Sequence, residues 1–218
     1  MKLSNRKLVR CCGTHLGDVW ASINYAILNN CDLSGRTNIN ANIDNRNIDV
    51  KKKIEEILPL LEGGDSIAVY DRLAGPTSIN AIWRTPYVNT KIQWKKRNYG
   101  RVCYQFDGRS SHQLKNLSKD DEKLFFDQNY NATRLGGHLS LKECVEVAAT
   151  SDLFIGVCSG MSHLCHSVGV PVYLIGHKRL HDYHTNKTYI YYKSMREFVA
   201  SRTNFRYKPT RRISSLAL

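Results

Sequence analysis

The sequence lacks the cysteine patterns of disulfide-stapled and zinc-binding proteins. Its seven cysteines are odd in number and include no Cys-x-x-Cys pair, and most of them lie within apolar segments. Cysteines of this kind are typical of reduced, buried thiols, so the sequence predicts a cytoplasmic protein, in the host cytoplasm if the chain is viral. An Asp-x-Asp pair, which commonly holds a divalent cation, is absent as well.

Long apolar runs are also missing. No stretch approaches the roughly 18 residues that a membrane-spanning helix needs, and residues 1–18 contain no apolar core of a signal peptide. We therefore expect a soluble protein without stable membrane insertion.

Acidic residues are scarce relative to basic ones. The chain has 19 Asp and Glu against 32 Lys and Arg, a net charge of +13 at pH 7. This excess is typical of proteins that bind a polyanion, whether nucleic acid, anionic lipid or lipopolysaccharide, and a generally basic composition is the alternative explanation. With 218 residues, of which 42% are hydrophobic, the chain can bury the core of one large or two small α/β domains.

The most informative stretch covers residues 151–176. Apolar residues are consecutive in 153–157 and again in 170–175, with a small-residue turn and a helical pattern between them. Consecutive apolar residues are typical of parallel strands that helices cover on both faces. The turn at 159–162 is therefore expected at the carboxyl edge of a sheet, where free amides and a helix dipole favour an anion. A plain strand-to-helix connection is the alternative.

A similar pattern opens the chain. A short, mostly apolar strand candidate at 8–12 precedes a turn at 13–18, and a helical pattern through Trp20, Ile23 and Ile27 follows. The repetition predicts a second Rossmann-like unit.

Residues 139–176 resemble the nucleotide-sugar-binding segment of the heptosyltransferase-like (family 9) glycosyltransferases of GT-B architecture. In that family a Ser/Thr-Gly-x-x-His-Leu turn after a buried strand cradles the donor diphosphate, and this chain has Ser159, Gly160, His163 and Leu164 in those places. The family usually carries an Asp before the turn that helps to read the sugar, whereas Cys158 stands here. The resemblance implies diphosphate binding without implying heptose. The donor-binding residues that it implies in this turn are Ser159, Gly160, Met161, Ser162 and His163.

The first turn carries the same resemblance. Leu16-Gly17-Asp18 matches a Leu-Gly-Asp turn whose Asp is the family's proposed general base in the cleft between the lobes. Asp18 would take the proton of the acceptor hydroxyl as that oxygen attacks the anomeric carbon. A helix cap is the alternative role, since Asp suits the first turn of a helix.

Together the two motifs predict a compact, GT-B-like α/β protein with two Rossmann-like lobes, parallel sheets and an interlobe cleft. Residues 1–98 would form the acceptor-side lobe and residues 99–193 the nucleotide-sugar-binding lobe. Residues 194–218 would form a helix and a basic tail that pack back toward the first lobe.

Further cations are expected near the donor. Arg109, Ser110 and Lys115 follow the predicted strand 102–106, where the family has a polar turn and a lysine that contacts the donor phosphates. In the absence of Asp-x-Asp, these side chains would stabilise the leaving diphosphate, so we expect no metal and no cofactor. Three histidines nearby have a spacing that suits one helical face, which leaves a metal site as the alternative to a loop over the donor pocket: His177, His181 and His184.

Basic and aromatic residues alternate in 91–101 and in 202–212. Cations neutralise phosphates and aromatic rings stack on exposed bases, so these segments suit a nucleic acid from which one nucleotide is extruded. A solvated linker is the alternative for 91–101. The acceptor-side residues predicted on this basis are His15, Trp94, Lys95, Lys96, Arg97, Arg206 and Arg211.

The sequence thus predicts a glycosyltransferase that uses a nucleotide-diphosphate sugar. Its size and basic-aromatic segments resemble phage enzymes that add glucose or arabinose to 5-hydroxymethylated cytosine, which favours double-stranded DNA as the acceptor. Two alternatives stay open: a surface-polysaccharide or lipopolysaccharide glycosyltransferase, and a non-catalytic nucleic-acid-binding protein on a Rossmann scaffold. The sugar, the base of the nucleotide, the stereochemistry and the oligomeric state stay undetermined.

Overall fold

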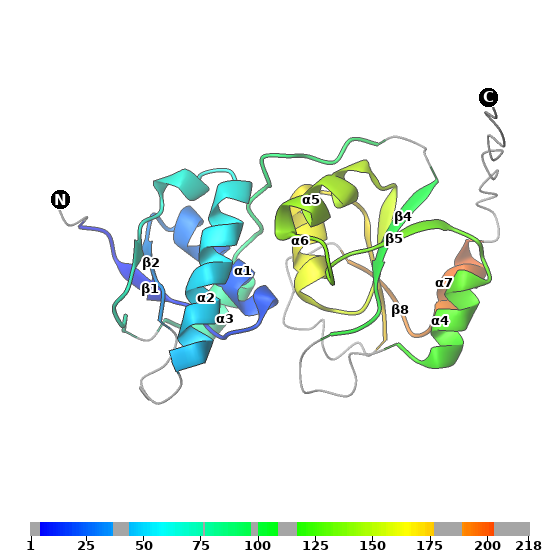
Figure 1. Cartoon of the computed structure of the whole chain (residues 1–218), viewed down its shortest axis with the longest axis horizontal. Helices are drawn as coiled ribbons and strands as arrows, with labels where there is room; N and C mark the ends of the chain where they lie inside the picture. Colours follow the sequence, from blue (N-terminus) through cyan, green and yellow to red (C-terminus); the bar gives the residue numbers. More distant parts are fainter. Residues whose placement is uncertain are drawn as a thin grey trace, which may run out of the picture.

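Two parallel β-sheets with helices packed on them form the two halves of the chain (Figure 1). The computed structural model describes residues 5–36, 44–75, 77–96, 100–108, 117–176 and 189–202, and the side chains of 44–48 are not described. This architecture confirms the predicted α/β class with parallel sheets.

The first lobe contains a three-stranded sheet in the order β1-β2-β3, all parallel. Parallel neighbours require a crossover connection, and here helices supply it. The strands are β1 (Leu8–Arg10), β2 (Asp32–Ser34) and β3 (Val69–Tyr70); the helices are α1 (Leu16–Leu28), α2 (Asp44–Ile57), the 3₁₀ turns η1 (Leu58–Leu60) and η2 (Gly64–Ser66), and α3 (Ile79–Arg84).

The second lobe contains a five-stranded parallel sheet in the order β5-β4-β6-β7-β8. The predicted strand within 153–157 is confirmed as β6, and all of its residues are buried, as expected for a central parallel strand. The strands are β4 (Arg101–Gln105), β5 (Asn131–Arg134), β6 (Leu153–Gly156), β7 (Val172–Ile175) and β8 (Ile190–Tyr192); the helices are α4 (Lys119–Phe126), α5 (Leu141–Thr150), α6 (Gly160–Val168) and α7 (Met195–Ser201).

The helices of the second lobe begin and end at the residues that local chemistry favours. Ser118 caps α4 by accepting the amide hydrogen of Asp121 at 3.1 Å. Ser140 and Glu143 form a capping box on α5. Gly169 ends α6 with a φ of 88°, a left-handed conformation that favours glycine.

One hydrophobic core runs through both lobes. Its buried members include Val9, Trp20 and Leu33 from the first lobe and Phe154 and Leu164 from the second. The two lobes are therefore joined by apolar packing as well as by the chain.

Helix α7 packs on the second lobe. Met195 and Phe198 are buried in a cluster with Phe125 and Ile155, and the amide of Met195 donates to Asp121 Oδ1 at 3.0 Å. We predicted that this helix packs toward the first lobe, but its apolar side is filled by residues of the second. The predicted basic tail after residue 202 lies outside the described residues, and the predicted boundaries at 98 and 193 stay predictions.

All seven cysteines are free, and only Cys12 is more than slightly exposed. Burial raises the pKa of Cys11 and of Cys12 to about 12 each. These two thiols, which directly follow β1, therefore keep their protons at neutral pH. Within the described residues, no helix has the length and apolarity to span a bilayer.

Candidate active site

The amino ends of α1 and α6 lie against each other. Leu16 occupies the space beside Gly160, where an added Cβ would lie 2.6 Å from the Leu16 Cβ. Gly17 lies against the imidazole of His163, where an added Cβ would lie 2.8 Å from Cδ2. Real Cβ atoms do not approach other atoms so closely, so both contacts require glycine. The fold therefore brings the two sequence motifs together, although they are far apart in the chain.

The two helices run side by side in the same direction. Leu16 contacts Gly160 and Gly17 contacts His163. Further along both helices, the indole Nε1 of Trp20 donates to Ser167 Oγ at 2.8 Å in a fully buried hydrogen bond. The contacts thus advance together along α1 and α6, which face each other between the sheets (Figure 1).

This alignment places two positive helix ends at one location. The first amides of a helix have no acceptor within it, and each amino end carries about half a positive charge. The α1 helix has 13 residues and α6 has 9, so both have a developed dipole. The junction of their amino ends is therefore suited to an anion.

Asp18 lies in the first turn of α1 and is half-buried. Its Oδ2 accepts the amide hydrogen of His15 at 3.3 Å, and a Cβ on Gly13 would lie 2.2 Å from the same oxygen. The carboxylate thus folds back over the turn before the helix, so it does cap α1. Capping does not preclude proton abstraction, because a carboxylate has two oxygens and several lone pairs. Its role as general base stays a prediction.

The turn before α1 is braced by neighbouring side chains. Lys53 of α2 donates from Nζ to the carbonyl of Thr14 at 2.8 Å. Ser22 accepts from the amide of Cys12 at 3.0 Å and donates to the carbonyl of Asp18 at 2.7 Å. No local pattern marks Lys53, because its contact with the turn depends on how α2 packs. His15, predicted on the acceptor side, is exposed.

The predicted donor turn forms a closed first turn of α6. Ser162 Oγ accepts from the amide of Ser159 at 3.1 Å and donates to its carbonyl at 2.7 Å. Met161, Ser162 and His163 are buried, whereas Ser159 and Gly160 are half-buried. Among these residues, Ser159 is thus the one whose side chain can contact a ligand, and the other contacts would come from backbone amides.

The donor turn also lies at the point where the strand order reverses. The chain runs from β4 outward to β5 and then returns to place β6 on the other side of β4. Gln105, the last residue of β4, accepts a hydrogen bond from Ser159 Oγ across this point. Ligands of open α/β sheets bind at such switch points. Gln105 was missed by sequence reasoning because strand order is not visible in the sequence.

A cation that the sequence analysis did not single out lies at the same sheet edge. Arg134, at the end of β5, donates to both carboxylate oxygens of Asp107 at 2.9 Å each. The predicted donor residues of the adjoining turn lie outside the described residues: Arg109, Ser110 and Lys115.

The chain between the lobes, residues 87–94, hydrogen-bonds to both of them. The amide of Val88 donates to Asn24 Oδ1 at 3.0 Å in the first lobe, and the amide of Thr90 donates to the carbonyl of Ser167 at 3.0 Å in the second. The indole of Trp94 donates to the carbonyl of Ser151 at 2.7 Å and packs against the core. This geometry favours a packing role for Trp94 over base stacking.

Lys95 and Lys96, which follow this segment, are exposed. The remaining predicted acceptor-side residues lie outside the described parts of the chain: Arg97, Arg206 and Arg211. The same holds for the three histidines of the alternative metal site, His177, His181 and His184. The described residues contain no group of three or more His, Cys, Asp or Glu side chains placed to hold a metal ion.

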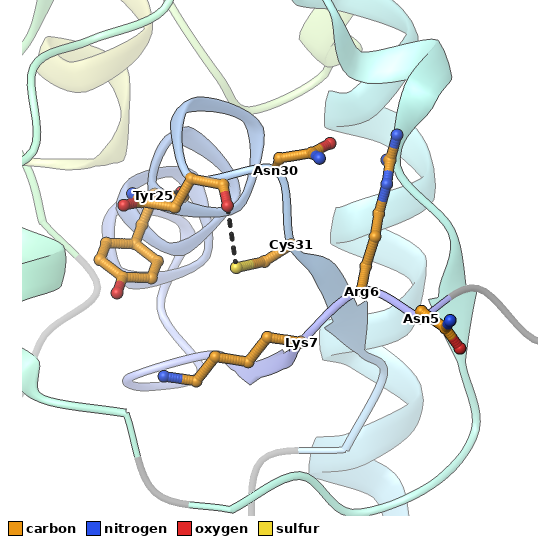
Figure 2. Close-up of a pocket in the computed structure, with 7 residues that line it drawn as sticks. Asn5, Arg6, Lys7, Tyr25, Asn30 and Cys31 are labelled. Carbon is orange, nitrogen blue, oxygen red and sulfur yellow. Dashed lines mark hydrogen bonds between the residues drawn. The ribbon is translucent and has the colours of Figure 1, made fainter.

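A separate hollow of about 570 Å³ lies at the opposite, amino edge of the first sheet (Figure 2). Asn29 and Asn30 at the carboxyl end of α1 line it together with Arg6 and Lys7. Arg6 donates from Nη1 to the carbonyl of Ser66, and the same nitrogen lies 3.9 Å from Asp32 Oδ1.

No protein-family model and no curated protein matches the chain. Among solved structures, the fold is similar to a dodecameric iron-containing heptosyltransferase, TibC, in complex with ADP-D-beta-D-heptose, with a TM-score of 0.54, 16% identity and coverage of 87% of this chain and 62% of that one. It is also similar to the iron-containing dodecameric glycosyltransferase TibC from enterotoxigenic E. coli H10407, with a TM-score of 0.52, 17% identity and coverage of 80% and 59%.

This similarity shows a glycosyltransferase-like fold. The chain spans less than two thirds of the length of either structure.

Proposed function

We propose that the protein is a glycosyltransferase that moves a sugar from a nucleotide-diphosphate donor to an acceptor hydroxyl without a metal ion or cofactor. The observation that carries the proposal is the junction of the α1 and α6 amino ends, where Leu16 contacts Gly160 and Gly17 contacts His163. Of the two motifs that resemble one glycosyltransferase family, one would supply the anion site and the other the carboxylate, and they lie next to each other.

The donor diphosphate is assigned to the amino end of α6. Backbone amides of residues 160 and 161 and the positive helix end would face the phosphates. The Ser159 hydroxyl would join them by exchanging its hydrogen bond to Gln105 for one to a phosphate oxygen. As the bond to the sugar breaks, negative charge grows on the leaving diphosphate, and fixed amide dipoles stabilise that charge. Lys115 and Arg109, predicted from the sequence, would add cations in place of a metal.

Asp18 is assigned as the general base. It lies in the first turn of α1, and a carboxylate is a side chain that can accept a proton as a general base. In the proposed step, Asp18 takes the proton of the acceptor hydroxyl and the oxygen bonds to the anomeric carbon. The bond from that carbon to the diphosphate breaks, and its electron pair leaves with the diphosphate.

Double-stranded DNA with hydroxymethylated bases is the acceptor that we propose. The net charge of +13 and the exposed Lys95 and Lys96 support a polyanion, although they do not by themselves distinguish DNA from lipopolysaccharide. In a non-catalytic nucleic-acid binder, the Asp18 carboxylate would serve only as the cap of α1.

The function is tested by mass spectrometry of acceptors incubated with a panel of nucleotide sugars. Hydroxymethylated DNA, unmodified DNA and a lipopolysaccharide core are offered in parallel, and Asp18→Asn protein is the control. A mass increase of one hexose or pentose on hydroxymethylated DNA alone supports the proposal. Transfer only to the saccharide would reassign the acceptor, and a lack of both nucleotide binding and transfer would refute the enzyme.

DNA binding should depend steeply on salt. If Lys95 and Lys96 contact phosphates, replacing both by Gln should flatten the log-log dependence of affinity on salt by about two contacts, at about 0.9 each. Fluorescence anisotropy with a labelled duplex measures this slope. Lys123→Gln with Lys142→Gln, two exposed positions on α4 and α5, is the matched control and should change the slope less. Weak, salt-independent binding by the wild-type protein would contradict a DNA acceptor.

A further inference from the structure

His163 is enclosed between the lobes. It is 3% exposed, and its Nδ1 is hydrogen-bonded to the hydroxyl of Tyr87. The Trp83 ring lies nearby, with 5.6 Å between the ring centroids. The opposite edge of the imidazole, Cδ2 and Nε2, lies against Gly17. The resemblance implies that this histidine contacts the donor, whereas its surroundings connect it to the turn that carries Asp18.

A second tyrosine extends this contact. The hydroxyl of Tyr87 is 3.0 Å from the hydroxyl of Tyr189, which lies directly before β8. Burial raises the pKa of both phenols, so each keeps its proton at neutral pH and can donate one hydrogen bond. Whichever nitrogen of His163 carries its proton, Nδ1 is held by Tyr87 and the ring orientation is fixed.

The fixed ring sets where Gly17 lies. Gly17 precedes Asp18 in the same turn. Because Gly17 has no side chain, a displacement of the imidazole would act directly on its backbone. Three residues earlier on α6, Gly160 contacts Leu16. The first turn of α6 thus touches both residues that precede Asp18, and the distance between the carboxylate and the donor turn follows from these two contacts.

We propose that His163, oriented by Tyr87 and Tyr189, is a positioning residue that fixes the Asp18 turn relative to the donor turn. The inference rests on the proposed function. In this role, His163 does not contact the reacting atoms. Misplacement of a reacting group by about 1 Å costs up to about 100-fold in rate, so a small shift of Gly17 is sufficient to matter.

The test compares Tyr87→Phe, which removes only the hydroxyl, with His163→Asn, which keeps an acceptor near Nδ1 and removes the edge that faces Gly17. Each should lower the rate of transfer by about 10- to 100-fold while donor affinity by calorimetry changes less than about twofold. The double variant should fall no further than the more impaired single variant, because both act through one contact. Tyr104→Phe, in the aromatic cluster of the second lobe, is the matched control.

A second readout is independent of the reaction. In ¹H–¹⁵N spectra, the amides of Gly17 and Asp18 should shift in both interface variants and not in Tyr104→Phe. If the wild-type protein transfers no sugar, the proposed function fails and these shifts still decide the positioning role. Unchanged Gly17 and Asp18 amides, or a loss of donor affinity equal to the loss of rate, would overturn the inference.

Discussion

Asp18→Asn is expected to lower the single-turnover rate of sugar transfer by about 100-fold or more, the scale of a lost general base. Asparagine can still accept the hydrogen bond from the His15 amide, so the α1 cap should persist. Loss of the charge at the helix amino end should cost only about 0.3–1 kcal/mol of stability. Rapid-quench measurement with saturating donor gives the rate, and calorimetry should show donor affinity close to that of the wild type.

Glu143→Gln is the matched control for this variant. Glu143 occupies the same position in the capping box of α5, in the second lobe, and accepts from the amide of Ser140 at 2.7 Å. Its replacement removes the same charge from a helix amino end and should leave transfer unchanged. If Asp18→Asn and Glu143→Gln transferred sugar equally fast, Asp18 would be a cap and nothing more.

Gly160→Ala is expected to destabilise the protein by about 1–3 kcal/mol, the usual cost of forcing a methyl group into a packed site. The new Cβ would meet three side-chain atoms of Leu16 within 2.8 Å. Helix propensity alone favours alanine by up to about 1 kcal/mol, so a net loss of stability identifies the clash. Because the clash separates the two helix ends, donor affinity should also fall by about tenfold or more. Urea denaturation and calorimetry measure the two effects.

Gly75→Ala is the comparison for this variant, since a Cβ there meets no atom within 4 Å. It should leave both stability and donor affinity near the wild-type values. Equal behaviour of Gly75→Ala and Gly160→Ala would mean that the contact between α1 and α6 yields easily and does not define the site.

Local features of the fold were readable from the sequence because short-range chemistry determines them. Consecutive apolar residues predicted β6, and α4 starts at Ser118, a residue type that favours the N-cap. Helix α2 ends at Ile57, because Pro59 lacks the amide hydrogen that would continue it, and the 3₁₀ turn η1 follows.

Contacts between distant segments were not readable. The sequence placed Gly160 in the predicted donor turn, but the atoms that approach it belong to Leu16 of the other lobe. Gln105 carries no motif, and only the order of β4 and β6 in the sheet places it beside Ser159. The lobe against which α7 packs is the one that offers an apolar surface to it, and no local sequence pattern predicts which lobe that is.

The parallel course of α1 and α6 bears on the end of the catalytic cycle. When the sugar leaves, the nucleotide diphosphate gains negative charge, so the two positive helix ends should hold the product more tightly than the donor. Under the proposed function, we expect nucleotide diphosphate to be a strong product inhibitor whose departure limits steady-state turnover. Activity in the cell would accordingly follow the removal of this product by other enzymes as closely as it follows the supply of donor.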